Sequence, residues 1–517
     1  MDESHGPHKW LIALTVMTGT IMAALDISIV NVALPHMRGT LGASVEEITW
    51  VSTGYILANV IIMPIVAFLS SRFGRKNFYI FSVLLFTVSS MLCGIAWDLT
   101  SMVIFRIMQG IGGGTLIPVS QSVLRETFPP KEQAMAMGIF GVGVMLGPAI
   151  GPTLGGWLTD NYSWPWIFYI NVPIGFINIL LIMKFIEDPH YLVRQTGRVD
   201  VLGLSLMMVG LGALQTMLEQ GEINDWFSSE FIIYLFVVAA LGLILFVWRE
   251  LKVENPVVNL RILKDINFSS ATFLNGLLGL ALMSSLFILP LFLQQLLGYP
   301  AFDSGLALIP RSVAMLIIMP LAGRIYNRVG PRLMIGAGLL LNAVSFYQLS
   351  ILSLSIGFWD ILLPQFLQGV GFALIFVSLS TAALSTIEKQ MLTAAAGLYN
   401  VVRQVFSSVG IALAATILTR GEQTNRSLLM EHITAFGNTS AETLRSLSQY
   451  FSSHGMDITD AQNKALKAIE EIVMRQASMI SFNHVFFLIA VVFVISTPLI
   501  FLINDLRREI KAGIINE

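Results

Sequence analysis

One carboxylate, Asp26, lies deep inside an apolar stretch of the chain, where charged groups are rarely tolerated. It falls within Leu25–Pro35, LDISIVNVALP, part of an apolar run that begins at Trp10. An acid at the centre of a membrane helix costs about 2.5–3.5 kcal/mol on insertion scales, so such acids are usually paired and functional. A lone buried acid can bind and release a proton or attract a cation. The alternative is an acid near a helix end that reaches water.

A cation, Arg106, lies inside a second apolar segment, 100–124, too deep to reach water easily. It needs a carboxylate, backbone carbonyls or water, and we expect Asp26 and Arg106 to act together in proton coupling. The glycine run Gly110–Gly114 has some likeness to a nucleotide-binding loop, but no strand precedes it, so it is better explained by helix packing. No GxxxxGK sequence occurs in the chain, so nothing indicates ATP as the energy source.

Other polar residues in or beside apolar segments are candidates for contact with a bound ligand. Arg311 is one more intramembrane cation, which either lines a cavity or makes a structural contact. The seven histidines are scattered and the single cysteine, Cys93, lies in an apolar run, so we expect no metal, cofactor or disulfide. The predicted substrate-binding residues are Asn31, Gln109, Gln294, Gln295, Gln365, Gln368, Tyr399, Asn400 and Arg403.

Composition assigns the chain to the membrane proteins. Of its 517 residues 55% are hydrophobic and only 12% are charged, whereas soluble domains carry roughly 25% charged residues. The net charge of −2 argues against a nucleic-acid partner. The scarcity of charge instead predicts a chain embedded in a lipid bilayer.

Fourteen apolar segments are long enough to cross a bilayer. The connections between them are mostly short. The exception is Thr419–Met479, a polar stretch that is predicted to be a long loop with helical patches. The predicted fold is therefore an all-α integral membrane protein. The predicted spans are 10–34, 48–70, 77–97, 100–124, 135–158, 166–186, 199–219, 231–250, 268–293, 304–323, 332–354, 359–386, 393–418 and 480–503.

The placement of lysine and arginine predicts the orientation. Most of the 30 basic residues lie at the N-terminus and in alternate loops, and the short loops of the other face hold only Arg38. Because basic loops stay in the cytoplasm, both termini are predicted to be cytoplasmic and the loop 419–479 to face outward. The first apolar segment is too long for a signal-peptide core and is expected to remain as a membrane helix.

An internal repeat divides the chain. Ala67–Lys76, AFLSSRFGRK, matches Gly323–Arg332, GRIYNRVGPR, at a shift of 256 residues, and Arg106–Gly112 matches Gln365–Gly371 at a shift of 259. Spans one to six thus match spans nine to fourteen, with two spans inserted between them. Parallel repeats of this kind are typical of transporters with a site between two bundles. The predicted domains are a six-helix bundle at 1–190, an inserted two-helix linker at 191–265 and a six-helix bundle at 266–517.

Span five carries a regular pattern of glycine and proline. Its glycines recur every four residues and so share one helical face, which allows another helix to approach closely, while the prolines bend the helix. We expect this face to seal against a helix of the second bundle and block leakage; ordinary packing is the alternative. The pattern comprises Gly143, Gly147, Pro148, Gly151, Pro152, Gly155 and Gly156.

Together these stretches resemble the fourteen-helix drug:proton antiporter group of the major facilitator superfamily, the EmrB/QacA type, over essentially the whole chain. LDISIVNVALP resembles its first-helix signature, 67–76 the GxxxDRxGRR loop, 106–112 the RxxQGxG motif, and 143–156 the antiporter motif. The stretches 161–175 and 224–230 are more similar to EmrB than to QacA. The loop has Ala67 and Ser71 where the family has Gly and Asp, so its contact to the neighbouring helix should be weaker. The expected gating-loop residues are Arg72, Gly74, Arg75 and Lys76.

The resemblance implies the major facilitator fold and a proton-coupled exporter of hydrophobic or amphiphilic toxic compounds, with no enzymatic activity. Transport would proceed by alternating access across the bacterial inner membrane. It also implies a periplasmic adaptor of EmrA type and an outer-membrane channel as partners, with loop 419–479 as docking surface. The alternatives are a loop without a partner, an exporter of one metabolite or siderophore, and an uptake symporter of the same fold.

Overall fold

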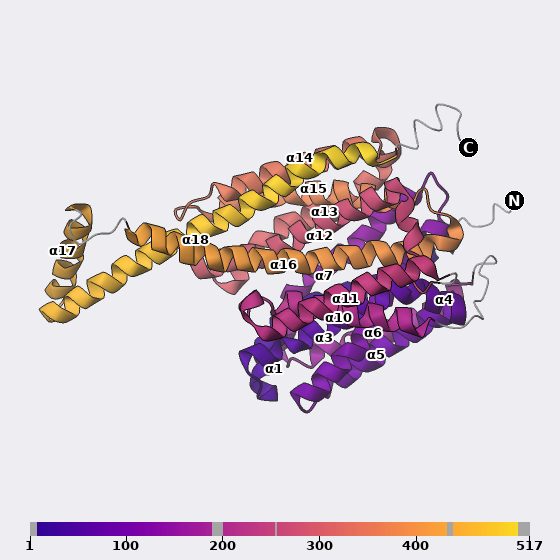
Figure 1. Cartoon of the computed structure of the whole chain (residues 1–517), viewed down its shortest axis with the longest axis horizontal. Helices are drawn as coiled ribbons and strands as arrows, with labels where there is room; N and C mark the ends of the chain where they lie inside the picture. The colour runs from indigo at the N-terminus through magenta and orange to yellow at the C-terminus, as the bar shows by residue number, and fades with distance from the viewer. Residues whose placement is uncertain (1–7, 189–199, 254–255, 432–437, 505–517) are drawn as a thin grey trace.

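The computed structural model describes residues 8–188, 200–253, 256–431 and 438–504, and these form helices joined by short turns (Figure 1). The helices before residue 200 are α1 (His8–Leu41), α2 (Val45–Ile48), α3 (Trp50–Ile62), η1 (Met63–Ile65), α4 (Val66–Phe73), α5 (Arg75–Gly94), α6 (Leu99–Thr127), α7 (Gln133–Asn161), α8 (Trp166–Tyr169) and α9 (Asn171–Phe185). Then follow α10 (Val201–Gln220), η2 (Trp226–Ser228), α11 (Glu230–Lys252) and η3 (Leu260–Lys264). The remainder are α12 (Ile266–Leu291), η4 (Phe292–Leu296), α13 (Ala301–Val329), α14 (Pro331–Ser350), α15 (Phe358–Ala383), η5 (Lys389–Met391), α16 (Leu392–Glu431), α17 (Asn438–Ser453), α18 (Ile458–Ser496) and η6 (Thr497–Leu502).

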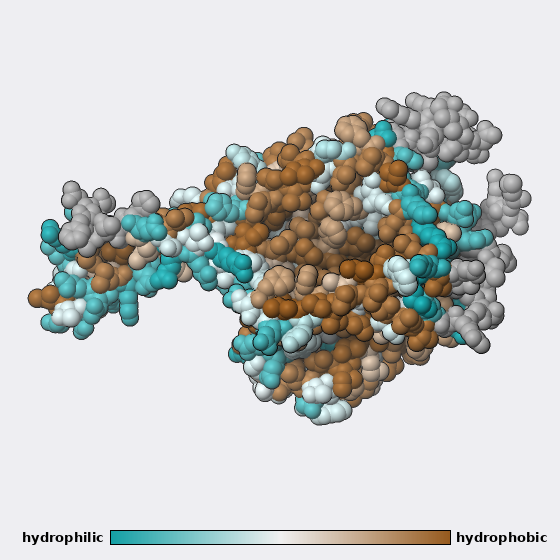
Figure 2. All heavy atoms as spheres, in the orientation of Figure 1, coloured by the Kyte–Doolittle hydropathy of each residue, from teal (hydrophilic) through white to brown (hydrophobic). Residues whose placement is uncertain are grey.

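The described residues contain 14 helical segments long and apolar enough to cross a membrane. This confirms the predicted all-α membrane fold. Figure 2 shows apolar side chains covering the body of the molecule, with polar side chains gathered at its two ends and along a projecting arm. Such a band matches the hydrocarbon core of a bilayer, which is about 30 Å thick.

The helices pack as two bundles with a pair of helices beside them. The helices α1 to α9 pack on one another and form the first bundle, and α12 to α18 form the second. The inserted pair, α10 and α11, packs against α3 of the first bundle and α16 of the second. Hydrogen bonds fix it to α16: Gln215 Nε2 donates to Ser408 Oγ at 2.7 Å, and Trp226 Nε1 donates to Thr416 Oγ1 at 2.7 Å. The predicted boundary at 190 lies outside the described residues, and that at 265 falls just before α12.

The sequence repeat corresponds to a structural repeat. Gly74 (φ 84°) links α4 to α5, and Gly330 (φ 88°) links α13 to α14, a backbone conformation that glycine adopts without strain. Beside the first turn, Arg75 donates to both carboxylate oxygens of Glu126, at 2.5 and 2.9 Å. Beside the second, Arg332 donates to the backbone carbonyl of Ile503 at 2.7 Å. Each linking turn is thus held to its own bundle by a basic side chain.

The predicted gating loop is also anchored at its helix start. The Lys76 backbone N–H donates to Asp188 Oδ1 at 2.8 Å, and Lys76 Nζ donates to the Met183 carbonyl at 2.7 Å. The hydroxyl of Ser71, which replaces the usual acid, donates at 2.9 Å to the Phe68 carbonyl of its own helix. Arg75 and Lys76 therefore both anchor the loop.

The two ends of the molecule differ. In Figure 1 the start of α1, helix α4 and the end of η6 lie at one end, the terminal face, and α17 projects from the other, the arm face. The helix α16 has 40 residues and α18 has 39. At 1.5 Å per residue each is about 60 Å long, twice the hydrocarbon core. Residues 419–431 and 438–479 therefore form a helical arm outside the apolar band.

This arm corrects the prediction of a long loop at 419–479. Helix formers continue through the segment, as in Asn463–Gln476, and such residues favour helix wherever packing allows it. Contacts between α16 and α18 supply that packing. Asn425 Nδ2 donates to Ser481 Oγ at 2.9 Å, and Arg426 pairs with Glu470.

At the terminal face the two bundles meet in two matching close approaches. A Cβ added to Gly138 of α7 would lie 2.5 Å from the Met319 carbonyl oxygen of α13. A Cβ added to Gly397 of α16 would lie 2.6 Å from the Met63 carbonyl oxygen of η1. Because glycine has no side chain, each helix can lie directly on the backbone of the other bundle. The two approaches are related by the internal repeat.

Polar and aromatic contacts close the same face. Ser122 and Thr393 hydroxyls lie 2.8 Å apart, and Asn327 Nδ2 donates to the Lys131 carbonyl at 2.6 Å. The rings of Phe140 and Phe376 stack across the bundles. Toward the arm face, by contrast, α3 has only sparse contacts with α16, whereas η1 and α4 pack against it. The protein is therefore closed at the terminal face.

The glycine face of span five was predicted to seal against the second bundle, but in the structure it packs within the first bundle. Gly147 packs on the backbone of Ala24, Gly151 on Ser28 and Gly155 on Ile29, all in α1 of the same bundle. The reason is that a different stretch of α7 faces the second bundle. The face that meets the second bundle begins one to two turns earlier, at Gly138 and at Gly141, which contacts Met319 and Phe376. The glycine and proline pattern instead brings α7 close to the helix that carries Asp26.

We predict that Gly138→Ala weakens closure of the terminal face, because the new methyl group would overlap a backbone oxygen. Overpacking typically costs about 1–3 kcal/mol, which would raise the open population by about tenfold. The measurement is the rate at which maleimide labels a cysteine at Thr393, which is 6% exposed in the closed gate, in a Cys93→Ala background. Gly305→Ala is the control, since nothing lies within 4 Å of its added Cβ. Equal labelling of both variants would contradict the assignment.

Candidate functional site

Asp26 and Arg106 form a direct ion pair in the interior of the first bundle. Arg106 Nη1 lies 2.6 Å from Asp26 Oδ2, and the two side chains are 1% and 0% exposed. The other carboxylate oxygen accepts from Gln109 Nε2 at 2.8 Å and from Asn171 Nδ2 at 3.2 Å. The predicted pairing of Asp26 with Arg106 is thus observed, and two amides complete it.

The guanidinium of Arg106 has several partners besides Asp26. Its Nε donates to the Val51 carbonyl at 3.1 Å, and Nη1 also donates to Gln109 Oε1 at 2.7 Å. The Tyr55 ring lies 4.3 Å away and the Phe168 ring 5.7 Å away, within range for cation–π attraction. The cation is therefore stabilised in the absence of water, and removing its acid would leave it uncompensated.

Close helix packing positions the network, which combines α1, α3, α6 and the start of α9. The glycine run of α6 makes this possible: an added Cβ would lie 2.5 Å from the Tyr55 carbonyl at Gly110, 2.7 Å from the Ser82 carbonyl at Gly112 and 2.9 Å from the Asn59 backbone at Gly114. Gly110–Gly114 thus packs α6 between α3 and α5, as expected for packing and not for phosphate binding.

The arrangement can act as a proton switch. With a charged carboxylate, the Asp26–Arg106 pair is electrically neutral. A proton on the carboxylate would cancel its charge and leave Arg106 without its counter-ion. Because a buried unpaired charge is strongly destabilising, protonation must change how the helices around the network pack. The site therefore has the chemistry that a coupling of proton binding to helix packing would require.

Two of the predicted glutamines lie in a corresponding place in the second bundle. Arg311 Nη1 donates to Ser285 Oγ at 3.1 Å, and Ser285 Oγ donates to Gln368 Oε1 at 3.4 Å. Gln365 Nε2 donates to the same oxygen at 3.4 Å. The cluster joins α12, α13 and α15.

The remaining predicted substrate residues are dispersed. Asn400 Nδ2 donates to Gln121 Oε1 at 2.8 Å and so belongs to the closed gate. Tyr399 and Arg403 are buried on the face of α16 that packs against α12, where Arg403 Cγ lies beside Gly279. Near the arm face, Asn31 Oδ1 accepts from Ser52 at 2.9 Å. Gln294 and Gln295 are exposed in η4, a turn of π-helix. The structure brings only Gln109 to the Asp26 network.

Several partners were missed from the sequence. Asn171 is fully buried and bridges Asp26 to Ser90 Oγ, 3.1 Å away; a lone amide in an apolar run was its only signal. The backbone carbonyl of Val51 and the ring of Tyr55 had none, because any residue type offers a carbonyl and aromatic residues are abundant here. Ser285 is one of many small hydroxyls in the membrane helices.

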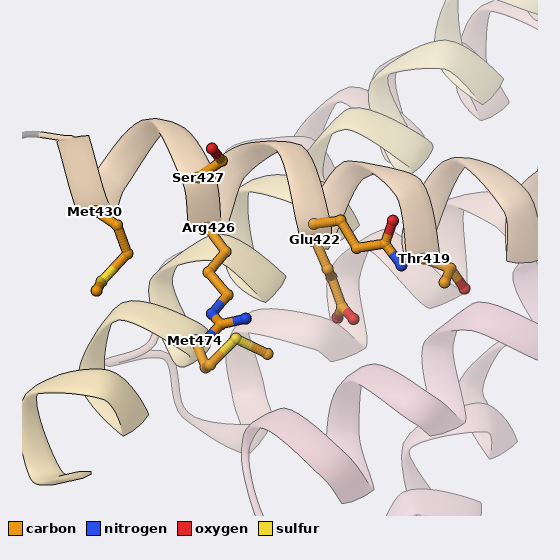
Figure 3. A pocket seen from close by; sticks show the side chains of 7 residues that line it. Thr419, Glu422, Arg426, Ser427, Met430 and Met474 are labelled. Atoms are coloured by element: carbon orange, nitrogen blue, oxygen red, sulfur yellow. The ribbon is translucent and has the colours of Figure 1, made fainter.

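Two cavities lie away from both networks. One of about 210 Å³ has an apolar lining and lies between the inserted pair and α16. The other, of about 380 Å³, lies at the root of the arm. Figure 3 shows Met430, Arg426 and Glu422 pointing from α16 toward Met474 of α18. The root cavity is lined by Thr419, Glu422, Gln423, Arg426, Ser427, Met430 and Met474.

We predict strong thermodynamic coupling between Asp26 and Arg106. Arg106→Gln should lower the free energy of unfolding by about 3–5 kcal/mol, since it leaves a buried carboxylate unpaired, and adding Asp26→Asn should restore part of the loss. A double-mutant cycle on the purified protein, from urea unfolding in detergent, measures this. The pair Lys9–Glu132, 2.7 Å apart and 19% and 39% exposed, is the control, with a coupling of about 0–1 kcal/mol. Equal coupling in the two pairs would contradict the assignment.

Comparison with known proteins gives a consistent result. The chain is 36% identical to the fatty acid resistance protein FarB of Neisseria gonorrhoeae, with 95% of each chain covered. It is 36% identical to the multidrug export protein EmrB of Haemophilus influenzae, with 93% of each covered. It is 33% identical to EmrB of Escherichia coli, over 96% of this chain and 95% of that one.

Solved structures show the same fold. The proton:xylose symporter XylE superposes with a TM-score of 0.61 at 14% identity, over 96% of each chain. The human organic anion transporter MFSD10 superposes with a TM-score of 0.59 at 13% identity, over 94% of this chain and all of that one. The sequence profile described as Major Facilitator Superfamily matches residues 16–411. The chain belongs to the major facilitator superfamily.

Proposed function

We propose that this protein is a proton-coupled multidrug exporter that moves hydrophobic or amphiphilic toxic compounds outward by alternating access. The observation that carries the proposal is the buried Asp26–Arg106 pair, a protonatable group at the centre of one half of a two-fold repeat. The names of the relatives, which concern multidrug export and fatty acid resistance, support export as the direction. The fold alone would not, since it is shared with a symporter.

The chain is a multi-pass protein of a bacterial inner membrane, and its termini are proposed to be cytoplasmic. The reason is the gathering of lysine and arginine in the loops of the terminal face, which the positive-inside rule places in the cytoplasm. The arm then projects into the periplasm. The closed terminal face corresponds to a transporter shut toward the cytoplasm.

The proposed cycle couples substrate to the charge of Asp26. When the protein faces outward, Asp26 takes a proton from the periplasm and substrate leaves. When it faces inward, the proton dissociates and substrate binds again. Each proton that enters supplies about 2.3 kcal/mol per 100 mV and about 1.4 kcal/mol per pH unit of gradient. Since a factor of ten in concentration costs about 1.4 kcal/mol, these together sustain a gradient of a few hundredfold.

The arm is the proposed docking surface for a periplasmic adaptor of EmrA type, which would connect to an outer-membrane channel. Its length carries it beyond the bilayer, and it exposes large apolar side chains to water. Tyr450 is 57% exposed, Leu466 54% and Ile472 53%. Large apolar side chains exposed outside the membrane are available for contact with a partner protein. The alternative is a solvated arm without a partner.

We predict that Asp26→Asn abolishes proton-driven export in a protein that still inserts into the membrane, with a lower free energy of unfolding because Arg106 loses its counter-ion. The amide keeps the shape of the carboxyl group and one acceptor oxygen, but it cannot bind or release a proton. Efflux of a fluorescent drug driven by a pH gradient in everted vesicles should fall at least tenfold, and the size-exclusion profile should not change. Asp160→Asn, at an exposed acid of α7, is the control and should transport normally. Efflux by Asp26→Asn at the wild-type rate would remove Asp26 from the coupling mechanism.

We predict that the arm is required for adaptor binding. Replacing residues 428–468 by a short glycine–serine linker keeps the pair Arg426–Glu470 that joins α16 to α18, so the membrane domain should still fold. A co-expressed EmrA-type adaptor should then no longer co-purify. The control is deletion of 505–517, which follows the terminal face. Undiminished co-purification with the shortened arm would rule out the arm as the docking surface.

A further inference from the structure

The second bundle holds a buried network that repeats the Asp26 network without its acid. In the first bundle, Asp26 contacts an arginine at 2.6 Å and a glutamine at 2.8 Å. In the second, the hydroxyl of Ser285 contacts Arg311 at 3.1 Å and Gln368 at 3.4 Å. A neutral serine therefore occupies the place of a carboxylate between a cation and an amide.

The helices that carry the two networks correspond through the internal repeat. Gly110 of α6 approaches the carbonyl of Tyr55 in α3, and Gly369 of α15 approaches the carbonyl of Arg311 in α13. Arg311 thus takes the position of Tyr55, at the 256-residue shift of the repeated turns, and Gly369 that of Gly110, at a shift of 259. The arginine of the first network lies on α6, whereas that of the second lies on α13, the counterpart of α3. Arg311 nevertheless contacts α12, the counterpart of the helix that carries Asp26.

The second network carries a positive charge that no described residue neutralises. Arg311 is 2% exposed, and among the described residues no carboxylate lies within ion-pair distance of it. Gln368 Nε2 is also buried, and it has no hydrogen-bond partner among the described residues. An unpaired cation in the membrane interior is costly. The cluster therefore holds a buried cation and an unused N–H donor, and the described residues supply no negative charge to it; its one unused acceptor is Gln365 Oε1.

We propose that Arg311, Ser285 and Gln368 bind the anionic head group, such as a carboxylate, of a transported amphiphile. This inference rests on the proposed export function and specifies a substrate class for it. The helices α13 and α15, which carry Arg311 and Gln368, lie at the interface between the bundles, since they contact α7 about two turns away at Met319 and Phe376. When the bundles part, a negative head group can enter and neutralise Arg311, while its apolar chain stays among apolar helices.

The test measures binding of two amphiphiles with the same chain and opposite charge. Purified protein in phosphatidylcholine nanodiscs, free of anionic lipid, is titrated with dodecanoate or dodecyltrimethylammonium, and intrinsic tryptophan fluorescence is followed. Arg311→Gln should weaken dodecanoate binding at least tenfold, as expected for loss of a charge-assisted hydrogen bond, and leave dodecyltrimethylammonium binding unchanged. Arg311→Lys should keep part of the dodecanoate affinity. Arg324→Gln, at an exposed arginine of the same helix, should match the wild type.

Unchanged dodecanoate binding by Arg311→Gln, or an equal loss for both amphiphiles, would overturn the site. If Arg311→Gln does not fold, Ser285→Ala tests the same cluster without removing the cation and should weaken only dodecanoate binding. Added anionic lipid that displaces dodecanoate from the wild type would identify a lipid head group as the natural occupant and overturn the substrate assignment. Efflux assays separate this from the proposed function: a wild type that exports no amphiphile refutes export, whereas one that exports both, with Arg311→Gln equally active, refutes only the anion site.

Discussion

The constraint on which the structure depends is electrical neutrality in a medium without water. Asp26 and Arg106 come from helices far apart in sequence, and neither charge is stable in the bilayer without the other. Their pairing fixes the depth and rotation of α1 against α6, and the amides of Gln109 and Asn171 extend it to α9. A single proton on Asp26 would remove this neutrality. The ion pair that constrains the packing of the first bundle is therefore also the site where a proton would disturb that packing most.

The repeat supplies two equivalent bodies that a change in this balance can move. Gly138 and Gly397 each lie on a backbone carbonyl of the opposite bundle, so closure of the terminal face is a contact between rigid helices and not between flexible side chains. Such contacts either fit or separate, which suits alternation between two states. The glycine face of α7 connects the parts, since it packs on α1 at Ala24, Ser28 and Ile29, beside Asp26. A shift of α1 is therefore transmitted to the helix that forms the gate.

The sequence predicted what hydropathy and charge determine: fourteen spans, the repeat and the Asp26–Arg106 pair, since an acid and a base in lipid each need the other. It failed where the answer depends on which face of a helix meets which neighbour. The face with Gly147 and Gly151 was assigned to the second bundle, but a one-residue difference in position turns a helix by 100°. Asn171 and Ser285 were missed because a short polar side chain in lipid gives no sign of its partner. The arm was taken for a loop because its segments are polar, and the contacts that hold the end of α16 to α18, such as Asn425–Ser481, cannot be read from composition.

The central claim is that substrate and proton compete through Asp26. The most direct measurement is proton release on substrate binding: a multidrug substrate is added to purified protein in unbuffered detergent solution at constant ionic strength, and the pH is followed with an indicator dye. If binding favours the ionised carboxylate, linkage requires release of up to about one proton per chain by the wild type and none by Asp26→Asn, although both bind the substrate. Equal release by the two proteins, or none by a wild type that binds substrate, would contradict the account.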